Sequence, residues 1–155
     1  MATISKIKIV DDRELRAEID HLYEKTDQVA LAKWAISCAK NVLTFVPDEN
    51  INLSIIETGF EINKRWQAGK ASVHEVRQAG FKIHALARTS STAVMTNAIR
   101  TAGQAVAVGH MREHAMVCAD YAIKTIGLAF QNDLNRIKAE RTWQLETLKH
   151  VLAEA

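Results

Sequence analysis

The chain contains few residues that interrupt regular structure. One proline and six glycines occur in 155 residues, so few positions suit the tight turns that join β-strands. Apolar residues instead recur at spacings of three and four, which is the period of an amphipathic helix. This combination predicts an all-α fold.

Capping signals divide the pattern into segments. The TSST sequence at 89–92 and the capping-box sequence SVHE at 72–75 are typical helix starts, and Pro47 is a typical helix stop. The N-terminal MATISKIKIV has lysines among its few isoleucines and lacks the apolar core of a signal peptide. We expect a single domain, 1–155, in which residues 1–10 form an N-terminal tail. We expect a bundle of five to seven helices, with segments from Asp11 to about Lys25 and over about 27–46, 50–68, 72–88, 92–129 and 131–153.

The segment 92–129 is expected to be one long central helix. It is rich in alanine and glycine, and Gly103 and Gly109 fall inside its periodic pattern. Close helix packing explains glycines at such positions better than phosphate binding does. Apolar residues occupy more than one side of this segment, which is typical of a helix surrounded by others.

The charge pattern argues against several classes of function. Twenty basic and 18 acidic residues give a net charge of +2 without a long run of one sign, whereas nucleic-acid-binding proteins usually carry a basic stripe. No stretch approaches the roughly 18 apolar residues of a membrane span. Cys38 and Cys118 lie among apolar residues, which is typical of buried thiols in a reducing compartment. We therefore expect a cytoplasmic protein that binds neither nucleic acid nor membrane.

The sequence GHMREHAMVC places His110, His114 and Cys118 four residues apart in succession. On a helix this spacing aligns two imidazoles and a thiol, which are common ligands of zinc and iron. Such a row is about 12 Å long, too long for all three side chains to reach one ion, so a further ligand would have to come from another helix, with His84 or Cys38 as candidates. We assign no metal and no cofactor, and keep His110 and His114 as candidate ligands of an alternative metal site.

A second interpretation of the same histidines is a polar pocket. His84 and Arg88 are four residues apart in KIHALAR and share a helix face. With His110 and His114 they would line a pocket that receives an anion or a side chain of a partner. The third interpretation is structural, with hydrogen-bonded histidines in the interior. If His110 and His114 are buried and neutral, stability should decrease as the pH falls through about 6.

Four stretches of the chain resemble one bacterial family. They are WAISCAKNVL at 34–43, WQAGKASVHEVRQAGFKIHALAR at 66–88, IRTAGQAVAVGHMREHAMVCADYAIKT at 99–125, and the closing ERTWQLETL. Together they resemble the group known as putative immunity proteins, which are small all-α proteins assigned to protect a cell against toxins of its own or of its kin. The position of Gln104 is often a histidine in that group.

The resemblance implies a protein that binds and neutralises a bacterial toxin without catalysis or cofactor. Inhibitors of basic nuclease toxins often carry an acidic face, which the net charge of +2 does not indicate. No HExxH, GxSxG, P-loop or GxGxxG motif is present, and we assign no catalytic residue. Two alternatives stay open: a metal-dependent helical-bundle enzyme that uses His110 and His114, and a structural or oligomeric module. Homodimerisation through long apolar helices is a further expectation.

Overall fold

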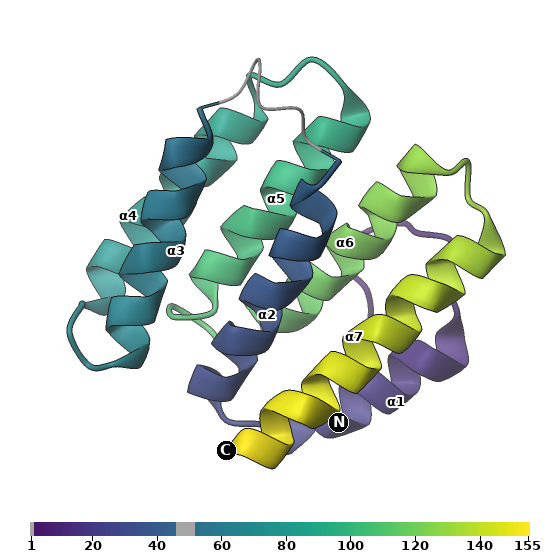
Figure 1. Cartoon of the computed structure of the whole chain (residues 1–155), viewed down its shortest axis with the longest axis horizontal. Helices are drawn as coiled ribbons and strands as arrows, with labels where there is room; N and C mark the ends of the chain where they lie inside the picture. Colours follow the sequence, from purple (N-terminus) through teal and green to yellow (C-terminus); the bar gives the residue numbers. More distant parts are fainter. Residues whose placement is uncertain (1, 46–51) are drawn as a thin grey trace.

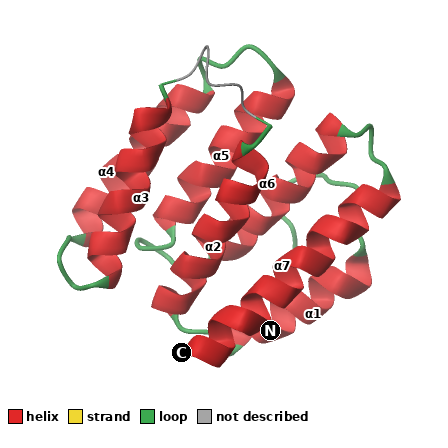
Figure 2. Cartoon of the chain, in the orientation of Figure 1, coloured by secondary structure: helices red, strands yellow, loops and turns green. Residues whose placement is uncertain are grey.

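The computed structural model describes residues 2–45 and 52–155. This part of the chain contains seven helices and no strand and forms one compact domain (Figures 1 and 2), which confirms the predicted all-α class. None of these helices is both long and apolar enough to cross a lipid bilayer. The helices are α1 Arg13–Glu24, α2 Gln28–Leu43, α3 Leu53–Gln67, α4 Val73–Ala87, α5 Ala93–Ala107, α6 His114–Ala129 and α7 Leu134–Glu154.

Side-chain caps explain where several helices begin. Ser72 and Thr92 accept hydrogen bonds from backbone N–H groups three residues later, as their sequence contexts predict. The first helix begins later than expected, because Asp12 rather than Asp11 caps it. The second helix ends at Leu43, and the expected stop at Pro47 lies outside the described residues.

The helices form two layers, one in front of the other (Figure 1). In the view of Figure 1, α3, α2 and α7 lie in front of α4, α5, α6 and α1. Helix α5 contacts α2, α3, α4 and α6, while α1 packs against α7. Trp34 of α2 is completely buried, and its indole N–H donates to the backbone carbonyl of Gln144 at 2.9 Å. The core therefore includes polar anchors as well as apolar packing.

The expectation of one long central helix over 92–129 is wrong. Helix α5 ends at Ala107 and α6 begins at His114, with turns between them. Arg112 in this connection donates to the backbone carbonyls of Tyr23 and Thr26 at 2.7 and 2.8 Å. These bonds fasten the connection to the end of α1.

Side chains from other helices explain the interruption. Asn63 of α3 donates to the carbonyl of Val106 at 2.9 Å, and Gln28 of α2 donates to the carbonyl of Val108 at 2.7 Å. The last carbonyls of a helix have no intrahelical partner, so these amides replace the bonds that a continuing helix would make. Gly109 fits tightly here, since a Cβ at this residue would lie 2.8 Å from Val76 Cγ1. The pattern of one segment could not predict contacts made by two others.

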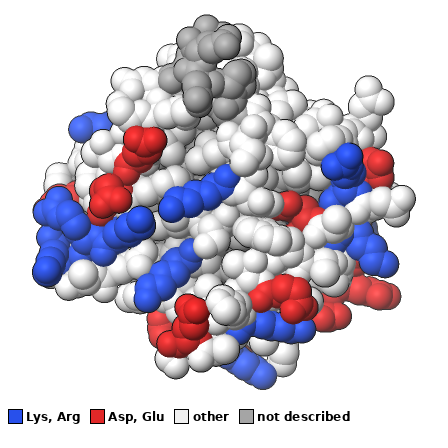
Figure 3. Space-filling model, in the orientation of Figure 1, with Lys and Arg blue, Asp and Glu red and all other residues white. Residues whose placement is uncertain are grey.

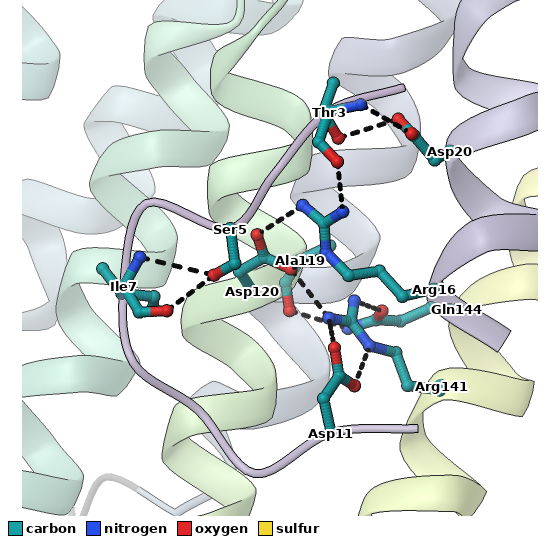
Figure 4. A network of polar contacts seen from close by, with 10 residues as sticks. All are labelled: Thr3, Ser5, Ile7, Asp11, Arg16, Asp20, Ala119, Asp120, Arg141 and Gln144. Carbon is teal, nitrogen blue, oxygen red and sulfur yellow. Dashed lines mark hydrogen bonds and ion pairs between the residues drawn. The ribbon is translucent and has the colours of Figure 1, made fainter. Parts of the chain in front are cut away.

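A buried ion-pair network joins α1, α6, α7 and the N-terminal segment (Figure 4). Arg141 has 0% side-chain exposure and donates to both carboxylate oxygens of Asp11, at 2.8 and 2.9 Å. Its Nη2 also donates to Asp120 Oδ1 at 2.7 Å. Arg16 donates to both oxygens of Asp120 at 3.0 and 2.9 Å. Burial opposes the charged form of Arg141, but the carboxylates of Asp11 and Asp120 outweigh it and raise its pKa.

The N-terminal segment lies along the helices rather than extending away from them. Thr3 donates its N–H and its hydroxyl to the Asp20 carboxylate at 2.7 and 2.8 Å, and its carbonyl accepts from Arg16 at 3.1 Å. Ile9 packs against the smaller apolar cluster around Ile123. Residues 2–10, expected as a tail, thus cover part of α1 and α6.

Candidate functional site

The turn between α5 and α6 brings two of the predicted site residues together. His110 lies in this turn and His114 is the first residue of α6, so they do not share one stripe of a continuous helix as expected. Their ring centroids are 5.8 Å apart and the rings are tilted by 31°. Both side chains are half-buried.

Gln104 orients the His114 ring. His114 Nδ1 lies 2.7 Å from Gln104 Oε1, and the amide oxygen can only accept, so Nδ1 carries the proton and Nε2 keeps a free lone pair in the neutral ring. Burial lowers the pKa of His114, and repulsion from the charged forms of His110, Lys6 and His84 lowers it further, against the opposing effect of Glu113. The fold therefore favours a neutral imidazole.

His84 of α4 lies directly on the backbone of α5. A Cβ at Gly103 would be only 2.6 Å from His84 Cε1, so only glycine leaves room for the ring in this position. Burial lowers the pKa of His84, and Arg100 and Arg88 lower it further. His84 is thus a second imidazole that the fold keeps neutral.

Two arginines complete the group. Arg88, which caps the C-terminus of α4, is exposed, and Arg100 is half-buried on α5. The side chains of both form no ion pair or hydrogen bond with any described residue. Arg100 was not predicted as a site residue. Its spacing of four residues from Gln104 indicates that the two share one face of the helix, but the sequence does not show which face of α5 points outward. The histidine–arginine cluster comprises His84, Arg88, Arg100, Gln104, His110 and His114.

The two cysteines differ from the residues of this cluster because both are completely buried. Cys38 and Cys118 are free thiols with 0% exposure, as the sequence predicts. The Cys118 thiol approaches the carbonyl of Ala35 at 3.4 Å, and burial raises the pKa of both thiols. In residues 2–45 and 52–155, no group of three or more His, Cys, Asp or Glu side chains is arranged to hold a metal ion.

The groove between α3 and α4 is a separate feature. Its volume is about 350 Å³, and its lining includes Gln78 and Lys82 of α4 but none of His84, Arg88 and the two other predicted pocket residues. His84 instead points from α4 towards α5. The cluster and the groove therefore use different sides of α4.

The chemistry of the histidine–arginine cluster suits recognition of an anion. A guanidinium group can donate two parallel hydrogen bonds to a carboxylate, and an imidazole gains a second N–H donor when it binds a proton. The groups come from α4, α5, the turn and α6, so the packing of several helices fixes their relative positions.

Comparison with known proteins identifies the family. One family's sequence model matches residues 21–151, from near the end of α1 to the last turn of α7. No curated protein and no solved structure matches the chain. The matched region contains every member of the histidine–arginine cluster and most of the chain, and it agrees with the family resemblance of the four sequence stretches. The chain belongs to the family of Imm-5 like putative immunity proteins.

Proposed function

We propose that this protein is a cytoplasmic bacterial immunity protein, which binds a toxin and neutralises it without catalysis. The observation that carries the proposal is the family match over residues 21–151. Such a role requires a stable scaffold with an accessible recognition surface and no cofactor.

The chemistry of the side chains supports binding rather than covalent chemistry. Both thiols are buried and their pKa values are raised, so neither supplies the thiolate that a cysteine nucleophile needs. The half-buried histidines and arginines offer donors for an anionic group. These features suit a surface that recognises a partner.

Co-expression tests this function. Each gene that neighbours this one is expressed alone to identify a product that poisons the cell, and then together with this protein. We expect growth to be restored with one such toxin, and not with an unrelated toxin of similar potency, because immunity is specific. Failure to restore growth against every toxic neighbour would refute the proposal.

Homodimerisation remains a separate prediction about this protein. Sedimentation of the purified chain at several concentrations tests it, because a dimer of two 17.3 kDa chains separates clearly from the monomer. Immunity by binding does not depend on this result.

A further inference from the structure

We infer that the toxin is recognised by a surface that α4, α5 and the turn after α5 form, and that the toxin presents a carboxylate-rich segment to this surface. This inference rests on the proposed function and adds the surface and the chemistry of the partner. The basic face is formed by Arg77, Phe81, His84, Arg88, Arg100 and His110.

Helix α4 supplies four members of this face from one side. Arg77, Phe81, His84 and Arg88 are spaced by four, three and four residues, which aligns them along a helix. The Phe81 side chain is 55% exposed, and the Arg77 guanidinium lies 5.8 Å from the centre of its ring. An exposed aromatic ring among arginines is the composition typical of residues that dominate binding energy.

Helix α5 and the following turn extend the face. Arg100 acts on His84 electrostatically, and the His84 ring covers Gly103, one turn of α5 after Arg100. His110 continues the surface towards His114, which Gln104 holds in a fixed orientation. The imidazole rings of His84 and His114 are positioned before a partner arrives, and such preorganisation reduces the entropic cost of binding.

The positive charge of this face is not neutralised within the protein. Arg88 and Arg100 form no ion pair with a described residue, and Glu113 is the one described carboxylate that acts on either His84 or His114. By contrast, side chains of both signs lie intermixed on the face formed by α2, α3 and α7 (Figure 3). Ion pairs such as Lys149–Glu146 also form away from the basic face.

A carboxylate-rich protein surface complements this arrangement. Arginine binds carboxylates through two parallel hydrogen bonds, and complementary charge speeds association and selects the partner. A single-stranded nucleic acid would also be anionic, but its successive bases stack on several aromatic rings. Phe81 is the one Phe, Tyr or Trp of the basic face, and the imidazole rings of His84 and His110 are half-buried, which favours a protein partner.

A charge reversal with a matched control tests the inference. Arg88→Glu with Arg100→Glu reverses two charges on the basic face. Lys82→Glu with Lys138→Glu makes the same change in net charge on exposed residues elsewhere, in the α3–α4 groove and on α7. Both variants are tested for rescue of cells that express the toxin identified by co-expression, and for affinity to the purified toxin by calorimetry. Thermal melting checks their folding.

We expect the Arg88/Arg100 variant to bind at least about 100-fold more weakly and to lose rescue, because like charges now meet across the interface. The Lys82/Lys138 variant should bind and rescue like the wild type. If the Arg88/Arg100 variant melts at a lower temperature than the wild type, Arg88→Gln with Arg100→Gln removes the charges without reversing them. Weaker toxin binding by this second variant supports the inference, and undiminished binding overturns it.

The outcomes separate the two proposals. Rescue by the wild type together with undiminished binding by the Arg88/Arg100 variant would overturn the surface assignment and leave immunity intact. Absence of rescue by the wild type would overturn both. Tight binding of single-stranded RNA or DNA that the arginine substitutions abolish, with unchanged affinity for the toxin, would assign this face to nucleic acid and refute a carboxylate partner.

Discussion

His84 and Gly103 show how one missing side chain can position a functional group. The His84 ring occupies the space that a Cβ of residue 103 would take. His84 was predicted as a site residue from its spacing to Arg88. Its contact with Gly103 was not predicted, because sequence gives no measure of how closely α4 and α5 approach.

Gly103→Ala should move His84 without unfolding the protein. Alanine in a helix interior is more stable than glycine by about 0.5–1 kcal/mol, which offsets the cost of turning a half-buried ring. We therefore expect little change in the free energy of unfolding but a rise of the His84 pKa towards its ordinary value as the ring enters solvent. NMR titration of the imidazole measures this.

Gly80→Ala is the matched control, because a Cβ there meets its nearest neighbour at an ordinary 3.7 Å. This variant should leave the His84 titration unchanged. An unchanged titration in Gly103→Ala as well would contradict the proposed contact.

His84 and His114 should make the free energy of unfolding depend on pH. Burial and positive neighbours lower the pKa of His84 and His114 in the folded state, while an unfolded histidine titrates near about 6.5. At pH values between the folded and the unfolded pKa, the unfolded chain binds more protons than the folded protein. The stability that these histidines contribute is therefore fully present above the unfolded pKa and is lost as the pH falls towards the folded pKa.

We expect the free energy of unfolding in urea to decrease between pH 7.5 and pH 5. The decrease should be smaller in a His84→Gln, His114→Gln variant, because both titrating groups are removed. His74→Gln, at an exposed position of α4, is the control. Equal pH dependence in wild type and double variant would show that these imidazoles are not held neutral.

At the scale of elements, the interrupted α5–α6 segment shows the reach of local sequence signals. Caps such as Ser72 and Thr92 act within a few residues, and they predicted the starts of α4 and α5. The end of α5 depends on Asn63 and Gln28, which are distant in the chain. Periodicity therefore predicted the helical character of 92–129 but not its division into two helices.

Asn63→Ala should destabilise this connection. Asn63 has 0% exposure, and its loss removes one donor to the Val106 carbonyl, to which the Gly109 N–H still donates at 3.3 Å. A hydrogen bond contributes about 0.5–1.5 kcal/mol to stability, so we expect a loss of that size in urea unfolding. Asn135→Ala, at an exposed position of α7, should change stability little. A loss in Asn63→Ala no larger than in this control would contradict the role of the amide.

At the scale of the whole molecule, the Arg141 network ties both ends of the chain to α6. Arg141 and Gln144 belong to the polar stretch ERTWQLE, whose composition alone is typical of a surface. Both are completely buried, because Asp11 and Asp120 lie against Arg141 and the carbonyl of Ala119 accepts from Gln144. Such pairing involves residues up to 130 positions apart, and no local pattern indicates it.

Arg141→Met should be strongly destabilising. It leaves the carboxylates of Asp11 and Asp120 without this partner, and breaking a buried pair costs about 3–5 kcal/mol. Urea unfolding measures the loss, with Lys138→Met at an exposed position of the same helix as the control. A loss below about 1 kcal/mol, the upper range for a surface pair, would show that the network contributes little.

The central claim, neutralisation by binding, is tested most directly by titrating the activity of the purified toxin with this protein. At toxin concentrations well above the dissociation constant, we expect activity to fall linearly and to reach zero at a fixed stoichiometry, as each protein molecule occupies toxin. The residual activity at each ratio should not change with time. Complete inactivation by a small fraction of an equivalent, progressing with time, would indicate catalysis, and full activity in the presence of excess protein would contradict neutralisation.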